Sequence, residues 1–161
     1  MKTATITELK KELQTKEQSE LVDLCLKLSK FKKENKELLT YLLYESNNED
    51  KYILNVKKEI DLQFLNINRK STYFVQKNVR KIQRNVKKYI RYSKQKETEV
   101  ELLIHFSRLL YDLLFNIKSS VLENILNRQI TVVKTKLSSL HEDLQFDYEC
   151  EIETFLTAKK S

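Results

Sequence analysis

The sequence contains no glycine and no proline in 161 residues. Glycine supplies the positive φ that many tight turns need, and proline commonly sets sharp turns and helix stops. Hairpin-rich β architectures depend on such turns, so their absence argues against a β protein. It favours helices joined by short polar connections.

Long hydrophobic runs are also absent, because no uncharged stretch exceeds the seven residues of 38–44 or 62–68. A helix needs about 20 predominantly apolar residues to cross a bilayer, so no transmembrane helix is expected. The first residues lack the apolar core of a secretory signal. The chain has two cysteines, Cys25 and Cys150, and they lie far apart, which suits a reducing compartment. We therefore expect a cytoplasmic protein.

Motifs of enzyme chemistry are missing too. There is no glycine-rich phosphate loop, no nucleophile elbow and no Cys or His cluster with metal-ligand spacing. The acidic segment 142–153 matches no calcium loop, so its carboxylates are expected to be solvated or ion-paired. His105, between Ile104 and Phe106, is expected to be partly buried with a hydrogen-bond partner. We expect a protein that is not an enzyme and needs no cofactor or metal.

Helical periodicity runs through almost the whole chain. Apolar side chains recur every three or four residues, most densely in segment 100–117, which we expect at the centre of the core. Candidate helix starts carry capping residues at Thr5–Glu8, Thr15–Gln18, Asp50, Ser71, Thr98–Glu101, Ser120–Glu123 and Ser139–Glu142. The pattern predicts an all-α fold, a compact bundle of about seven to eight antiparallel helices, with residues 1–161 forming a single domain.

Positive charge is concentrated in one stretch. Residues 62–96 hold eleven of the 30 Lys and Arg of the chain and no Asp or Glu, although the formal net charge of the whole chain is only +7. The remaining residues carry 19 basic and 23 acidic side chains and are net negative. The basic character of the protein is therefore local.

The charges of this stretch lie on one side of its expected helix. At about 100° per residue, the apolar side chains from Val75 to Ile90 fall within an arc of about 100°. Seven cations occupy an arc of about 120° opposite them. We call these seven side chains the cationic face: Lys77, Arg80, Lys81, Arg84, Lys87, Lys88 and Arg91. Like charges on neighbouring turns repel one another unless something compensates them.

Besides simple solvation of the charges, two interpretations account for this face. The first is a binding or scaffold protein that docks an anionic macromolecule, in its most concrete form nucleic acid, with Tyr73 and Tyr92 stacking on exposed bases. The second is a structural or protein-interaction module whose cationic helix pairs with the acidic segment 142–153 of its own chain or of a neighbour. The sequence also leaves open a homodimer formed through the cationic helix or segment 100–117.

Four segments resemble uncharacterised bacterial all-helical proteins of unknown function. They are LKKELQTKEQSELVDLCLKL (9–28), NKELLTYLLYE (35–45), YFVQKNVRKIQRNVKKYIRYSKQKETEVELL (73–103) and LHEDLQFDYE (140–149). The resemblance implies a bacterial origin and an all-helical fold. It attaches no activity, so no functional residues follow from it.

Overall fold

The computed structural model describes residues 2–157, and in this range it contains helices and no strands. The all-α prediction is therefore confirmed. The helices are α1 (Ile6–Gln14), α2 (Gln18–Phe31), α3 (Lys33–Thr40), the π-helical turn η1 (Tyr41–Glu45), α4 (Glu49–Leu65), α5 (Thr72–Ser93), α6 (Lys96–Asn116), α7 (Ser120–Leu137) and α8 (Glu142–Thr157).

The chain divides into two compact units, residues 1–44 and 45–161. The assignment of residues 1–161 to a single domain stays a prediction. In the first unit, α2 and α3 pack against each other. The side-chain amide of Asn35 donates a hydrogen bond to the carbonyl of Leu28 at 2.9 Å and so fixes their junction. No residue of α1, α2 or α3 is buried, so these helices form no closed core of their own.

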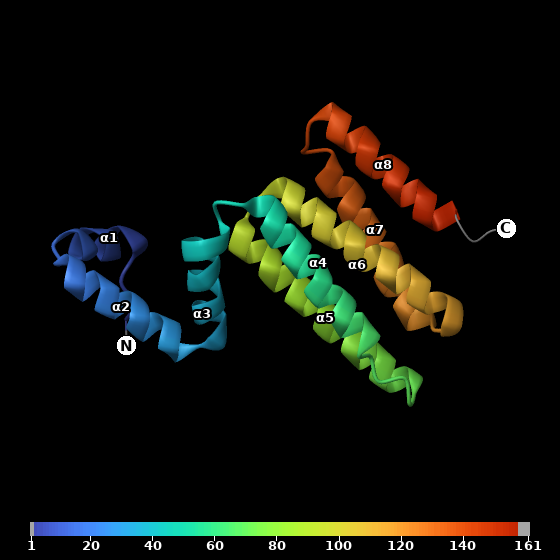
Figure 1. Ribbon diagram of the computed structural model, residues 1–161, viewed down its shortest axis with the longest axis horizontal. Helices are drawn as coiled ribbons and strands as arrows, with labels where there is room; N and C mark the ends of the chain where they lie inside the picture. The colour runs from blue at the N-terminus through green and yellow to red at the C-terminus, as the bar shows by residue number, and fades with distance from the viewer. Residues whose placement is uncertain (1, 158–161) are drawn as a thin grey trace. The chain divides into compact units, whose positions relative to one another are not determined.

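In the second unit, α6 is the central helix. It packs against α4, α5, α7 and α8, and α4 also packs against α5. Its buried side chains include Leu102, Ile104, Phe106 and Leu110, which confirms the expected place of segment 100–117 in the core. The ring of Phe106 meets that of Phe64 edge to face with centroids 5.6 Å apart. In Figure 1, α6 and α7 lie between α5 and α8.

Several predicted caps are confirmed and others are displaced. Thr5 and Glu8 form the predicted capping box, and Ser71 caps α5 by accepting a hydrogen bond from the amide of Phe74. The predicted box at Thr15 is wrong, because the Thr15 hydroxyl donates to the Glu12 carbonyl and Glu17 caps α2 instead. The cap of α4 is Asn48, not Asp50.

The predicted box at Thr98 is also wrong, because the N-cap of α6 is Gln95, three residues earlier. Thr98 is instead buried in the first turn, where its hydroxyl donates to Oε1 of Glu49 at 2.6 Å. Ser93, at the end of α5, donates to the same oxygen. One carboxylate at the start of α4 therefore ties α5 and α6 together. The cap of α7 is Ser119, one residue before the predicted Ser120.

The end of α5 shows how the chain manages without glycine. Lys94 follows the last helical residue and adopts a left-handed conformation with φ of 59°, and its amide donates to the Ile90 carbonyl at 2.9 Å. Glycine usually occupies this position because a Cβ atom is strained there. Lys94→Gly is therefore expected to raise the free energy of unfolding by about 0.5–1 kcal/mol.

Urea unfolding followed by circular dichroism would measure this gain. Lys94→Ala is the matched control, because it removes the same charge but keeps the Cβ atom. Equal stabilities for the two variants would contradict the explanation.

Candidate polyanion-binding face on helix α5

The packing of α5 determines which way its charges point. Val75, Val79, Ile82 and Val86 are buried as predicted, while Tyr89 and Ile90 are half-buried. On the opposite side, six of the seven cations of the cationic face are exposed, and Lys88 is half-buried. Packing against the core therefore holds the helix in place, with its charged side chains facing solvent.

Amide side chains mark the two edges of this face. On one edge, Gln76 donates to the Ser119 hydroxyl at 3.2 Å, and Gln83 donates to the side-chain carbonyl of Gln129 at 3.1 Å. On the other edge, Asn85 donates to the side-chain carbonyl of Gln63 at 2.8 Å. These bonds reach α7 and its cap on one side and α4 on the other. They fix the rotation of α5 about its own axis.

Five cations of the face have no carboxylate partner within residues 2–157: Lys77, Arg80, Lys81, Arg84 and Lys87. The Lys88 ammonium lies 4.9 Å from the centroid of the Tyr89 ring, a cation–π contact. Elsewhere in this unit lysines do find carboxylates, since Lys57 pairs with Glu101 and Lys136 pairs with Glu99. The repulsion along α5 is thus left uncompensated at its centre.

The acidic segment 142–153 lies within α8, which packs against α6 and α7. Among the described residues, none of its carboxylates pairs with the cationic face, and the pair found on α8 joins Asp143 to His141. The pairing of the two segments within this one chain is therefore not found. The reason is topological: α6 carries α5 and α8 on different sides (Figure 1). Pairing with a neighbouring copy stays a prediction.

Tyr148 shows what the inner side of α8 does instead. Its hydroxyl donates to Oε1 of Glu101 at 3.3 Å and lies 3.5 Å from Oε1 of Glu97. Burial, together with the negative charges of Glu101 and Glu97, raises the pKa of Tyr148 above its ordinary value. The phenol therefore stays protonated and joins α8 to α6.

The two tyrosines expected to stack on bases differ. Tyr73 is exposed at the start of α5, as that interpretation requires. Tyr92 is buried, and its ring packs edge to face with Tyr89 at a centroid distance of 6.3 Å. The expectation for Tyr92 is therefore wrong. At the last turns of α5, neighbouring helices cover more than the predicted apolar arc. Tyr52 of α4 reaches this end, and its hydroxyl donates a hydrogen bond to the Tyr89 carbonyl at 2.9 Å.

The centre of the cationic face offers a direct test of the repulsion. Arg84 has like charges three and four residues away on both sides: Arg80, Lys81, Lys87 and Lys88. Each such pair destabilises a helix by roughly 0.2–0.5 kcal/mol at low salt. Arg84→Gln is therefore expected to raise the free energy of unfolding by about 1 kcal/mol in 10 mM salt.

Urea titrations in 10 mM and 1 M NaCl would measure this difference, and the gain should vanish at high salt, where charges are screened within about 3 Å. A gain that persists in 1 M NaCl would point to a cause other than repulsion.

His105 is placed as predicted, partly buried and with a partner. Its Nε2 atom lies 2.7 Å from Oδ1 of Asp61. Burial lowers the pKa of His105 below its ordinary 6.5, and this effect outweighs the hydrogen bond and charge of Asp61, while Arg108 and Lys57 lower it further. The unfolded chain then binds more protons at His105 than the folded chain does. The contribution of His105 to the stability of the fold therefore falls as the pH drops through about 6.5.

His105→Gln keeps an amide donor toward Asp61 and cannot be protonated in this range. The variant is expected to lose less stability than the parent protein between pH 7.5 and pH 5.5, measured by urea unfolding at each pH. If the stabilities of the parent protein and the variant change with pH in parallel, the pKa of His105 is not lowered in the folded protein.

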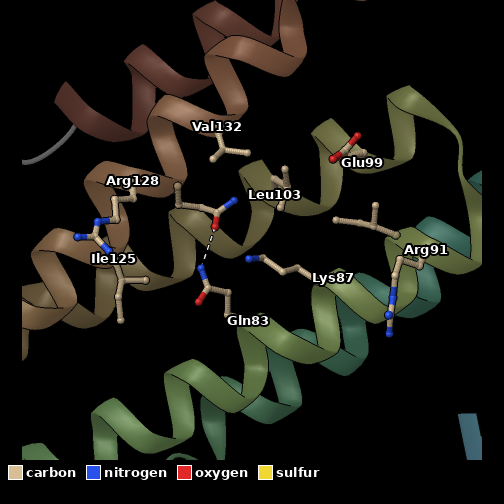
Figure 2. Close-up of a pocket in the computed structure, with 10 residues that line it drawn as sticks. Gln83, Lys87, Arg91, Glu99, Leu103, Ile125, Arg128 and Val132 are labelled. Atoms are coloured by element: carbon tan, nitrogen blue, oxygen red, sulfur yellow. Dashed lines mark hydrogen bonds between the residues drawn. The ribbon is translucent and has the colours of Figure 1, made fainter.

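A groove of about 540 Å³ adjoins the cationic face, between α5 and α7 and over α6. It is lined by Gln83, Lys87, Ile90, Arg91, Glu99, Leu103, Ile125, Arg128, Gln129 and Val132 (Figure 2). Sequence reasoning placed Lys87 and Arg91 on the face but missed the rest. No local signal could have found the groove, because α5 and α7 are far apart in the sequence and are brought together by the packing of both on α6.

Residues 2–157 contain neither a cluster of metal ligands nor a helix that could span a membrane. No three His, Cys, Asp or Glu side chains gather there in an arrangement that could hold a metal ion. Every helix in this range is too short or too polar to span a bilayer.

Comparison with known proteins adds no assignment. The chain matches no protein-family model, no curated protein and no solved structure. The bacterial origin implied by the resemblance therefore stays a prediction.

Proposed function

We propose that the protein is a non-enzymatic binding or scaffold protein of the bacterial cytoplasm, and that the cationic face of α5 docks an anionic macromolecule. Nucleic acid is the partner that we favour. The observation that carries the proposal is the group of five exposed cations without a carboxylate partner among the described residues. A polyanion would relieve their mutual repulsion at the moment of binding.

The dimensions of the face fit a phosphate backbone. From Lys77 to Lys87 the helix rises about 15 Å at 1.5 Å per residue. One strand of B-form DNA carries a phosphate about every 3.4 Å along its axis, so this length faces about four phosphates. Arginine at positions 80 and 84 supplies planar donors that bind phosphate oxygens in pairs. None of these contacts reads base identity, so the binding proposed is not sequence-specific.

Salt dependence tests the proposal most directly. Fluorescence anisotropy of labelled duplex DNA and of single-stranded RNA would be measured between 50 and 300 mM NaCl. For about four phosphate contacts, the logarithm of the binding constant should fall against the logarithm of salt with a slope of about −3 to −4.

Heparin and polyglutamate serve as competitors of different chemistry. Competition by heparin together with weak competition by polyglutamate supports a phosphate or sulfate partner. Preferential competition by polyglutamate would point to an acidic protein instead. A binding constant that does not change with salt concentration, or no binding at 50 mM NaCl, would rule out a polyanion site on α5.

The first unit supports a second candidate, a protein-interaction module that is homodimeric. Helices α1, α2 and α3 bury none of their residues, and together with η1 they expose many large apolar side chains. These are Ile6, Leu9, Leu13, Val22, Leu24, Leu26, Leu28, Phe31, Leu42, Leu43 and Tyr44. Monomeric proteins rarely expose apolar side chains so densely, and a second copy would cover them.

Analytical ultracentrifugation over 1–100 µM would test this candidate. We expect a dimer that Leu28→Lys together with Phe31→Lys converts to a monomer. A parent protein that is monomeric throughout the range would remove the homodimer.

A further inference from the structure

The most unusual polar group of the protein lies in the groove between α5 and α7. Gln129 is only 3% exposed, and its side-chain carbonyl accepts the hydrogen bond from Gln83. Its Nε2 group has no hydrogen-bond partner among the described residues. A buried donor without an acceptor costs roughly 1–3 kcal/mol, so this group needs an acceptor from outside the protein, which a water or a larger molecule can supply.

The charges around this amide favour an anion. Lys87 extends into the groove from α5, and Arg91 and Arg128 stand at its two ends (Figure 2). The one acidic residue of the lining, Glu99, already pairs with Lys136, whose Nζ lies 3.0 Å from its Oε1. The repulsion that Glu99 would exert on an anion is therefore largely offset.

The remaining lining is apolar and comes from all three helices: Ile90, Leu103, Ile125 and Val132. The volume of about 540 Å³ lies within the range of small-molecule sites, roughly 300–1,000 Å³. A bare ion would leave this lining unused. An apolar body carrying one acidic group would use both parts of the groove.

We propose that the groove between α5 and α7 binds a small organic anion with a carboxylate or phosphate on an apolar body. The acidic group lies by Lys87 and an acceptor oxygen takes the Nε2 hydrogen of Gln129, while the body covers Leu103, Ile125 and Val132. The amide is covered by its neighbours, so the bound molecule reaches it when exposed side chains at the mouth, such as Lys87, move aside.

This site goes beyond the polyanion face, with which it shares Lys87 and Arg91, because the amide and most of the apolar lining belong to α6 and α7. The difference makes the two proposals separable. A ligand held only by the cations of the face that lie outside the groove would touch neither Val132 nor Gln129.

The test is isothermal titration calorimetry of the full chain with four probes: 1-naphthyl phosphate, 1-naphthoate, 1-naphthol and inorganic phosphate. We expect one site per chain, with at least one of the naphthyl anions binding about tenfold or more tighter than 1-naphthol and than inorganic phosphate. The preferred naphthyl anion identifies the acidic group as carboxylate or phosphate. Equal affinity for 1-naphthol and both naphthyl anions would overturn the proposal.

Variants then locate the site. Val132→Asp places a carboxylate at a position that is 42% exposed, so folding is retained, and it should weaken binding of the preferred anion at least tenfold. Gln129→Leu removes the amide at similar volume and should weaken binding about tenfold. Lys134→Ala, an exposed cation elsewhere on α7, is the control and should bind as the parent does. Binding unaffected by both Val132→Asp and Gln129→Leu would place the anion on the cationic face and overturn the proposal.

Discussion

Phe106→Ala is expected to lower the free energy of unfolding of residues 45–161 by about 3–5 kcal/mol. Phe106 is fully buried on α6, and its ring meets Phe64 of α4 edge to face. Truncation removes the apolar surface of the ring and leaves a cavity that its helical neighbours cannot fill without moving. A domain is commonly stable by 5–15 kcal/mol, so this single change removes a large part of the total.

Urea unfolding followed by circular dichroism at 222 nm measures this loss. Phe146→Ala removes the same side chain from α8, where it is 68% exposed, and should change stability by no more than about 0.5 kcal/mol. A loss of less than 1 kcal/mol for Phe106→Ala would mean that α6 is not the centre of the core.

Reversing three charges of the cationic face is expected to abolish most polyanion binding. The variant Arg80→Glu, Lys81→Glu and Arg84→Glu replaces three exposed cations that have no carboxylate partner among residues 2–157. Each lost phosphate contact should reduce the salt slope by about 1, and the new carboxylates repel the backbone. Affinity for duplex DNA at 100 mM NaCl should fall by about 100-fold or more.

The matched control reverses three exposed lysines outside the face, Lys51, Lys58 and Lys134, and changes the net charge equally. It should lose only the small affinity that depends on overall charge. The triple variant on α5 should keep the unfolding midpoint of the parent or exceed it, because it removes like-charge repulsion. The control variant should keep the midpoint of the parent, because its three substitutions are at exposed positions. Equal losses of affinity in the two variants would show that binding follows net charge and not the face.

Residues close together in the sequence account for the predictions that succeeded. The apolar repeat from Val75 to Val86 identified the buried side of α5, and the density of leucines identified α6 as the core helix. Both follow from helical periodicity alone. The start of α6 could not be read this way, because Gln95 gives no side-chain cap and Thr98 is taken up by Glu49 of another helix.

The expectation for Tyr92 was wrong for a related reason. A helical wheel gives the angle of a residue on its own helix, but burial depends on how many neighbours surround that helix. At the end of α5, neighbouring residues bury side chains outside the apolar arc as well, and Tyr92 is one of these. Partners from distant segments decide such positions.

The sequence by itself determined that the chain is helical, which side of α5 is buried, and that seven cations share the other side. These properties follow from composition and from a period of 3.6 residues. Only the tertiary structure decided that the acidic helix α8 packs against α6 and α7 and does not neutralise the face. It also placed α7 beside α5 and so formed the groove around Gln129. The reason is that the choice of neighbours depends on how several apolar stripes bury one another at once, which no single segment encodes.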